Sequence, residues 1–259
     1  TDIDGKRIRV LHEASFQDDA TRMLRAIRYE QRLGFTLDVS TEELLTSSYD
    51  YLSTVSGDRL RHEFELIFEE EKATEILLRA SELGLLQSCY KGISSFSSLE
   101  SRFSSLDGLG WDRDHSFYYA LLAYDMDDGE VSDFALRFNI PNSESELARQ
   151  VVRIKNLSSS WDSQTLPSEV YNSIRGFLVR SVEVVGKTTT NQQVSTLLSY
   201  YLTHSQHVKP ELRPSDLVAM GFEEGPLLGK VYRQLTDAVM DGKLPGKQEQ
   251  ISFIKGLLR

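Results

Sequence analysis

The sequence predicts an all-α protein. Apolar residues recur at helical spacing along most of the chain, alternating apolar and polar runs are scarce, and only six of the 259 residues are proline. Apolar residues make up 40% of the chain, which is enough for a globular core, and no apolar run approaches membrane-spanning length. We therefore expect a multi-helix protein that makes no membrane contact.

The N-terminal sequence is polar and predicts no signal peptide. The single cysteine, Cys89, excludes an internal disulfide framework and indicates a reducing compartment. We expect a cytoplasmic protein in which Cys89 is a buried structural thiol.

Helix start and stop signals divide the chain into successive helices. The first begins after Ser15 and stops at Gly34, the second opens at Thr41, and the run 115–124 is rich in aromatic residues. Helices are predicted at about 16–33, 42–53, 57–70, 72–83, 115–124, 130–138, 144–157, 168–178, 190–204, 226–241 and 248–258. Serine- and glycine-rich stretches predict loops at 91–98 and 107–110, and another loop is expected at 158–167. The alternation at 182–185 is too short to predict a strand.

The first helix has two chemically distinct sides. Ser15 can cap it, and Asp18 completes a start that is similar to a capping box. One side is mainly apolar and holds Ala20, Leu24, Ile27 and Gln31. The other is polar and holds Asp18, Asp19, Arg22, Arg25, Tyr29 and Arg32. An aspartate and an arginine three residues apart can together address a nucleobase edge, because the carboxylate accepts from an amino group and the guanidinium donates to ring acceptors.

The run Asp18-Asp19-Ala-Thr-Arg22, continued by Leu-Arg-Ala-Ile-Arg and Leu-Gly-Phe, resembles the base-recognition motif of the bacterial class II tRNA nucleotidyltransferase and poly(A) polymerase family. The sequence departs from the family pattern at Asp18, where Glu is usual, and at Tyr29, where Phe is usual. The resemblance implies that Asp19 and Arg22 pair with incoming CTP or ATP. It also implies nucleotide-base contacts from the neighbouring side chains Asp18, Arg25 and Arg28. The alternative is a surface helix in which Asp18 and Asp19 form ion pairs with Arg22.

Two flanking segments extend the resemblance. Asp2-Ile3 and the run 8–12 resemble the last strand that leaves the family's catalytic head. The run 55–64 resembles the family's Arg-x-x-x-Glu neck motif. Arg59 and Glu63 are four residues apart on a helix, so we expect them to form a structural ion pair.

The family's catalytic head carries a Gly-Gly turn and an Asp-x-Asp pair that holds two metal ions. This sequence contains no Gly-Gly dipeptide, and its three Asp-x-Asp patterns, at 2–4, 112–114 and 125–127, follow no such turn. We therefore expect no catalytic residue and no metal ligand in this chain, which alone would be inactive. The resemblance implies that the absent head binds Mg²⁺ in the intact enzyme, with CTP and ATP as substrates. The five histidines form no metal-binding motif.

A second motif, 213–230, resembles the family's tail pattern and the helix-hairpin-helix design. Its turn leads into a helix with Pro226 at the first position, where free N–H groups can hold a phosphate. We expect RNA contacts from Lys230 and Arg233. The net charge of −10 is uneven, because 36–83 holds twelve acidic and four basic residues, whereas 167–259 holds nine acidic and eleven basic residues. The acidic block is expected to be a solvated outer face that repels phosphate.

The resemblance implies the base-selecting and tRNA-binding region of a template-independent RNA nucleotidyltransferase, which acts in tRNA 3′ processing by adding C or A. The expected partners are the acceptor arm of tRNA or another RNA 3′ end, a nucleotide and the catalytic head. Residues 1–15 would be the linker from the head, 16–86 the neck, 87–166 the body and 167–259 the tail. Two other functions stay open, a helical RNA-binding adaptor and a protein-interaction scaffold.

Overall fold

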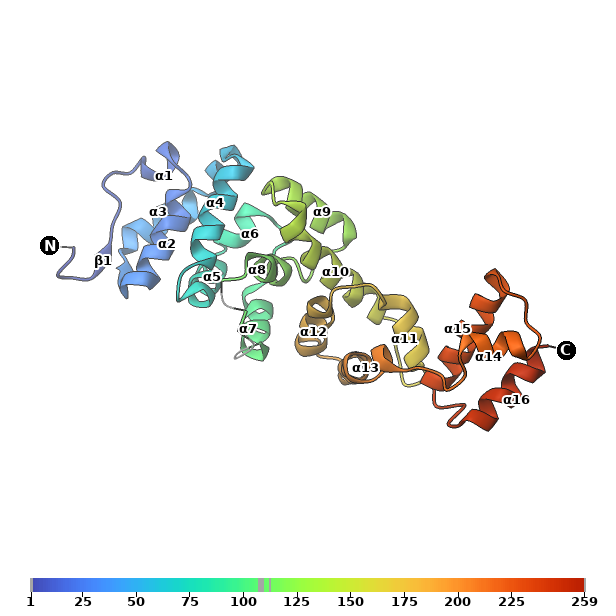
Figure 1. Cartoon of the computed structure of the whole chain (residues 1–259). Helices are drawn as coiled ribbons and strands as arrows, with labels where there is room; N and C mark the ends of the chain where they lie inside the picture. The colour runs from blue at the N-terminus through green and yellow to red at the C-terminus, as the bar shows by residue number, and fades with distance from the viewer. Residues whose placement is uncertain (1, 107–109, 112, 259) are drawn as a thin grey trace. The chain divides into compact units, whose positions relative to one another are not determined.

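The computed structural model describes residues 2–106, 110–111 and 113–258, and it confirms the all-α prediction (Figure 1). The predicted loop at 107–110 and the pattern at 112–114 therefore lie partly outside the described residues. The chain divides into two compact units, of which the first ends at Asn156 and the second begins at Leu157. The four-part division into linker, neck, body and tail stays a prediction. Within the described residues, no helix has both the length and the apolar character that crossing a membrane requires.

The first unit begins with a short strand, β1 (Arg7–Ile8), which pairs in parallel with β2 (Thr36–Leu37). Its helices are α1 (Ser15–Asp18), α2 (Arg22–Leu33), α3 (Val39–Ser47), α4 (Gly57–Phe68), α5 (Ala73–Glu82), α6 (Leu85–Cys89), α7 (Phe96–Ser105), α8 (His115–Leu122), α9 (Asp128–Arg137) and α10 (Asn142–Ser158), with a 3₁₀ helix at Tyr49–Thr54. Figure 1 shows α2, α4 and α5 side by side, and each packs on the other two.

The second unit is also helical. Its elements are α11 (Pro167–Ile174), α12 (Val179–Thr188), α13 (Gln192–Thr203), α14 (Pro214–Ala219), α15 (Pro226–Met240) and α16 (Lys247–Leu257), with a 3₁₀ helix at Ser205–His207. A core of Leu212, Leu217, Phe222, Val231, Leu235 and Ile254 joins α14, α15 and α16.

The predicted first helix is wrong in one respect, because it is broken into α1 and α2. At the break, Asp19 has an extended backbone, and its carboxylate accepts hydrogen bonds from the Thr21 backbone N–H at 3.0 Å and the Thr21 hydroxyl at 2.8 Å. Such local bonds compete with the helical pattern. Ser15 also does not cap the helix, since the N-cap position is Ala14. The predicted stop at Gly34 is confirmed, and Gly34 adopts the left-handed conformation with φ 62°.

Two further predictions need correction. The predicted loop at 91–98 ends in a helix, because α7 begins at Phe96 and the buried Leu99 and Phe103 repeat at helical spacing. The short alternation at 182–185 lies within α12, whose Val182 and Val185 are both buried on one helical face. In both segments, small polar or β-branched residues made the helical spacing of the apolar residues hard to recognise in the sequence.

An aromatic core fixes α4 against α8 and α9. The Phe64 and Phe138 rings meet edge to face with centroids 5.0 Å apart, and Phe68 stacks on Tyr118 at 4.8 Å. Such ring pairs stabilise a fold beyond the apolar area that they bury. Cys89 is buried as predicted, and burial raises the pKa of its thiol to about 12. The core therefore holds α4 in a defined position beside the functional residues described next.

Candidate functional site

Asp19 is held at the start of α2 by groups from two directions. Besides the two bonds from Thr21, the Arg59 guanidinium on α4 donates to Asp19 Oδ1 at 2.7 Å. All three donors use Oδ1, so Oδ2 is available as an acceptor. Partial burial raises the pKa of Asp19, but the Thr21 hydrogen bonds and the Arg59 charge lower it, and the net pKa is below the usual value. Asp19 is therefore a preoriented carboxylate.

Arg22 is the first residue of α2, and its backbone N–H donates to the Asp19 carbonyl at 3.1 Å. Its guanidinium donates to the backbone oxygen and the hydroxyl of Ser15, both at 3.1 Å. Asp18 lies beside His12 at 3.6 Å. Among the described residues, neither Asp18 nor Asp19 forms an ion pair with Arg22, so the pairing proposed in the surface-helix alternative is wrong.

The expected ion pair between Arg59 and Glu63 is also wrong. Each side chain contacts a different element: Arg59 reaches Asp19, whereas Glu63 lies 3.2 Å from Arg25 and 3.7 Å from Arg28. The reason is the position of α4, whose first turn faces the start of α2 and whose second turn faces the middle of that helix. Arg59 therefore contacts the break before α2, whereas Glu63 contacts the middle of α2.

Arg28 and Arg25 differ in accessibility. The Arg28 side chain is only 7% exposed and lies between Glu63 and Glu70, 3.3 Å from the latter. The Arg25 side chain is 45% exposed although it also contacts Glu63. The expected solvated acidic face is thus partly wrong, because the Glu63 side chain is 7% exposed and faces the arginines of α2.

Two hollows lie on either side of Arg25. One, of about 360 Å³, is lined by Asp19, Thr21, Arg25, Asp58, Arg59, His62 and Glu63. The other, of about 450 Å³, is lined mainly by 8–12 together with Ser15, Phe16, Arg22, Arg25, Ala26 and Tyr29. Asp19 and Arg22 therefore face different hollows with Arg25 between them. Arg28 lines neither of the two.

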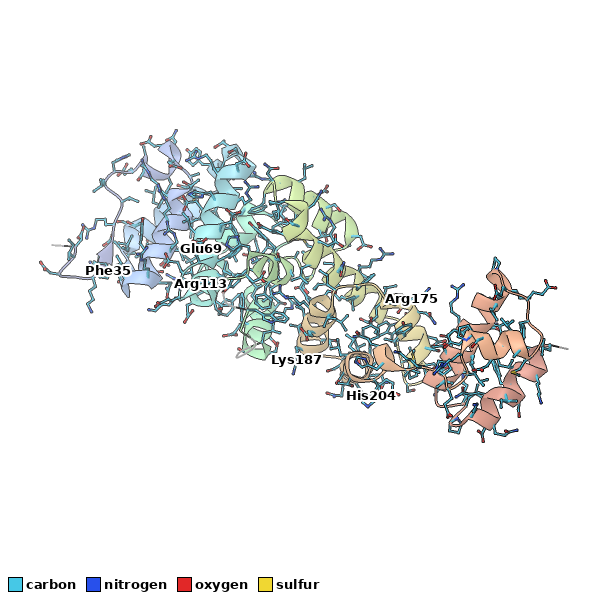
Figure 2. All side chains as sticks on the ribbon, in the orientation of Figure 1. Phe35, Glu69, Arg113, Arg175, Lys187 and His204 are labelled. Carbon is cyan, nitrogen blue, oxygen red and sulfur yellow. The ribbon has the colours of Figure 1, made fainter. Side chains whose placement is uncertain are left out.

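A third hollow, of about 400 Å³, has walls of both charge signs. It is lined by Arg32, Glu69, Glu70, Glu71, Lys72 and Arg113. Figure 2 labels Glu69 and Arg113, which face this space from two segments far apart in sequence. The mixed charge gives no preference for an anionic ligand.

The second unit contains the predicted turn before α15. Pro226 is the first residue of that helix, and Gly221 and Gly225 both have positive φ, at 115° and 153°. Gly225 provides no side-chain cap, so the first N–H groups of this 15-residue helix are open to a ligand. Lys230 and Arg233 are exposed one turn apart, and Arg233 Nε donates to the Gly229 carbonyl.

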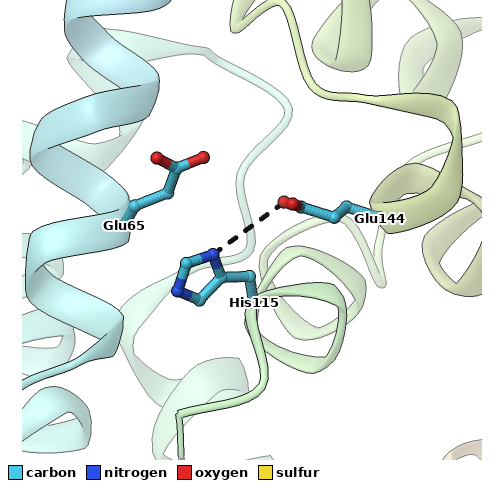
Figure 3. Close-up of side chains that lie close together, drawn as sticks. All are labelled: Glu65, His115 and Glu144. Carbon is cyan, nitrogen blue, oxygen red and sulfur yellow. Dashed lines mark ion pairs between the residues drawn. The ribbon is translucent and has the colours of Figure 1, made fainter.

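The structure also brings together three potential metal ligands that sequence reasoning missed. Glu65 on α4, His115 at the start of α8 and Glu144 in the first turn of α10 converge, with ligand atoms within 4.8 Å of one another (Figure 3). The three residues are remote in sequence and share no motif spacing. Only the packing of α4, α8 and α10 places them together.

Comparisons with known proteins agree with this fold. A family profile described as "Probable RNA and SrmB- binding site of polymerase A" matches residues 34–96. The chain is 27% identical over 270 residues to an A-adding tRNA nucleotidyltransferase of Geobacter sulfurreducens, covering 95% of this chain and 30% of that protein. It is 26% identical over 265 residues to a CCA-adding enzyme of Bacillus velezensis, covering 96% of this chain and 64% of that protein. The chain thus spans less than two thirds of these relatives.

Solved structures give the same result for the fold. A Thermotoga maritima CCA-adding enzyme complexed with tRNA aligns over 100% of this chain and 66% of that chain, with a TM-score of 0.70 and 24% identity. A CCA-adding enzyme in complex with ATP aligns over 99% of this chain and 63% of that chain, with a TM-score of 0.69 and 24% identity.

Proposed function

We propose that this chain is the region of a tRNA nucleotidyltransferase that selects the base and binds tRNA. The chain belongs to the family of these enzymes, which contains the CCA-adding and A-adding enzymes. The observation that carries the proposal is the fixed Asp19 carboxylate, which lies just before α2 and three residues before Arg22. Thr21 and Arg59 occupy Oδ1, and Oδ2 is left to accept from a ligand.

The chemistry of this pair suits cytosine and adenine. Both bases carry an exocyclic amino group next to a ring nitrogen acceptor, so Asp19 can accept from the amino group while Arg22 donates to the ring. Uracil and guanine present a carbonyl oxygen at the corresponding position. A carboxylate opposite that oxygen leaves two acceptors facing each other without a proton, which disfavours both bases.

Arg25, Arg28 and Glu63 have supporting roles in this proposal. Arg25 separates the two hollows and is exposed enough to contact a nucleotide. Arg28 is buried between two glutamates, so we assign it to holding α2 on α4 instead of contacting the base. Asp18 is exposed beside His12 and can contact the nucleotide only from the edge of the site.

The tail part of the proposal rests on the second unit. The open N-terminus of α15 and the exposed Lys230 and Arg233 can contact an RNA backbone, because N–H groups and basic side chains both attract phosphate. The similarity to the Thermotoga maritima CCA-adding enzyme that was solved in complex with tRNA supports tRNA as the partner. We infer that Mg²⁺ and the phosphoryl transfer chemistry come from a catalytic head outside this sequence.

A direct experiment tests the proposal. The purified chain is incubated with tRNA lacking its 3′ end, Mg²⁺, CTP and ATP, and tRNA binding is measured in parallel by fluorescence anisotropy. We expect tRNA binding without nucleotide incorporation. Incorporation by the chain itself would contradict the proposal that a separate catalytic head supplies the phosphoryl transfer chemistry. Absence of tRNA binding would favour a protein-interaction scaffold. An RNA-binding adaptor would bind RNA but would show no preference for CTP and ATP over UTP and GTP.

A further inference from the structure

The cluster of Glu65, His115 and Glu144 is separate from the proposed base site and has no part in it. The three residues come from α4, α8 and α10, and their ligand atoms lie within 4.8 Å of one another (Figure 3). His115 Nδ1 is 4.0 Å from Glu144 Oε2, and His115 Nε2 is 3.8 Å from Glu69 Oε1. Both separations are too long for a hydrogen bond, so among the described residues the imidazole is surrounded by carboxylates without bonding to them.

Within the part of the chain that the structure describes, two buried polar atoms near this cluster make no hydrogen bond. Glu144 Oε2 is inaccessible and makes no hydrogen bond, and the same is true of the Tyr119 hydroxyl, whose residue is 0% exposed. Buried polar atoms are nearly always bonded, so an exception requires an explanation, such as a water molecule or an ion that completes the bond. Tyr119 follows His115 by four residues on α8, so the two residues share one face of that helix. Burial and the charges of Glu65 and Glu144 raise the pKa of Tyr119. The unsatisfied Oε2 atom thus belongs to Glu144, which is itself one of the three clustered residues.

Charge gives an independent reason for a cation. Glu65, Glu69 and Glu144 lie around one imidazole. Among the described residues, the arginine paired with this group is Arg61, whose Nε lies 3.4 Å from Glu65 Oε1. Arg61 also contacts Asp58, so its charge is shared. A partly buried group of carboxylates is costly unless a cation or a proton compensates it.

We propose that Glu65, His115 and Glu144 bind one divalent transition-metal ion of the zinc type. One imidazole nitrogen with two carboxylate oxygens is a donor set that zinc accepts, and the remaining position would be filled by water. Zinc bonds of about 2.0–2.2 Å require the three donors to approach one another slightly more closely than they do now. All three side chains are partly exposed.

Neighbouring groups fit this assignment. If His115 Nδ1 binds the metal, the other ring nitrogen, Nε2, faces Glu69. A metal-bound histidine is commonly oriented by a carboxylate at its other nitrogen, and Glu69 would have this role. The Phe68 ring, with its centroid 5.7 Å from that of His115, restricts the imidazole from the other side. The ion would join α4, α8 and α10 within the first unit, and thereby stabilise the helix that holds Asp19.

The test measures zinc binding by the full chain. After treatment with EDTA and dialysis, Zn²⁺ is titrated in competition with a chromophoric chelator at pH 7.5, and thermal unfolding is followed with and without Zn²⁺. We expect one tightly bound equivalent, a Zn²⁺-dependent rise in Tm and no displacement by excess Mg²⁺. His115→Ala should lose this equivalent, and Glu144→Gln should weaken it at least tenfold while the circular dichroism spectrum keeps its helical form.

The matched control is the double variant His204→Ala/His207→Ala, which removes the two neighbouring histidines of the second unit. It should keep the bound equivalent. The absence of a stoichiometric zinc equivalent, or its loss in the control but not in His115→Ala, would overturn the proposal. A Tm that does not respond to Zn²⁺ would also overturn it.

Discussion

Arg59 on α4 donates to Asp19 at the start of α2 across 2.7 Å, and this contact joins two segments that are 40 residues apart in the chain. It makes the orientation of Asp19 depend on the position of α4. The aromatic contacts of Phe64 and Phe68 in turn fix the position of α4. Packing in the core therefore determines, through Arg59, where the Asp19 carboxylate lies in the proposed base site. Arg59 therefore acts as a positioning residue for Asp19.

Replacing Arg59 with alanine should raise the pKa of Asp19, because one of the groups that lowers it is removed. A depressed carboxyl pKa stabilises the fold above the ordinary aspartate value, and this stability is lost as pH falls through the folded-state pKa. The variant should thus begin to unfold in acid at a higher pH. Its loss of stability at pH 7 should be at most about 1 kcal/mol, because the Arg59 side chain is 55% exposed.

The measurement is an NMR pH titration of the Asp19 carboxyl carbon, and Arg59→Lys is the control. Lysine keeps the charge, so the pKa of Asp19 should stay low in that variant. An unchanged pKa in Arg59→Ala would mean that Thr21 alone holds the carboxylate.

Glu63→Gln should destabilise the chain strongly. The change leaves the buried Arg28 guanidinium with Glu70 as its remaining ionic partner, and breaking a buried ion pair from one side costs roughly 3 kcal/mol. Urea unfolding at pH 7 measures the difference. Glu71→Gln, an exposed change in the same acidic run, should leave the midpoint unchanged. Equal midpoints for the two variants would show that the pairing of Glu63 with α2 contributes nothing to stability.

Replacing both Lys230 and Arg233 with glutamate should weaken tRNA binding and reduce its salt dependence. Each lost phosphate contact lowers the slope of log K against log salt by about 0.7–0.9. Fluorescence anisotropy over a series of salt concentrations measures both quantities. Lys6→Glu/Lys91→Glu changes the net charge equally at exposed positions outside the second unit, and it should keep the slope. The same slope for both double variants would place the RNA contact elsewhere.

Local signals predicted much of this structure. Gly34 ends its helix in the left-handed conformation, Pro226 begins α15, and α4 begins and ends within two residues of its expected bounds. These features depend on short-range chemistry that a sequence displays directly. The expected apolar face of the first helix is also buried at Ala20, Leu24 and Ile27.

Side-chain partners were less predictable, because tertiary packing decides them. Helical spacing predicted an ion pair between Arg59 and Glu63. In the structure each has another partner of opposite charge, Asp19 for Arg59 and Arg25 for Glu63. The break at Asp19 arose from the carboxylate bonding to Thr21, which competes with a pattern that is otherwise helical. The convergence of Glu65, His115 and Glu144 has no local signal at all, since it depends on how three distant helices pack.

The most direct test of base selection by Asp19 and Arg22 is the choice of nucleotide. This choice is measured in the enzyme that combines this chain with a catalytic head. Relative incorporation of CTP, ATP, UTP and GTP is measured for the parent, Asp19→Ala and Arg22→Ala, with thermal unfolding as the control for folding. Each variant should lose about 1–3 kcal/mol of base discrimination, with CTP and ATP use falling together and UTP and GTP misincorporation rising, while Tm changes little. Variants that unfold while base choice stays intact would contradict the claim and make both residues structural.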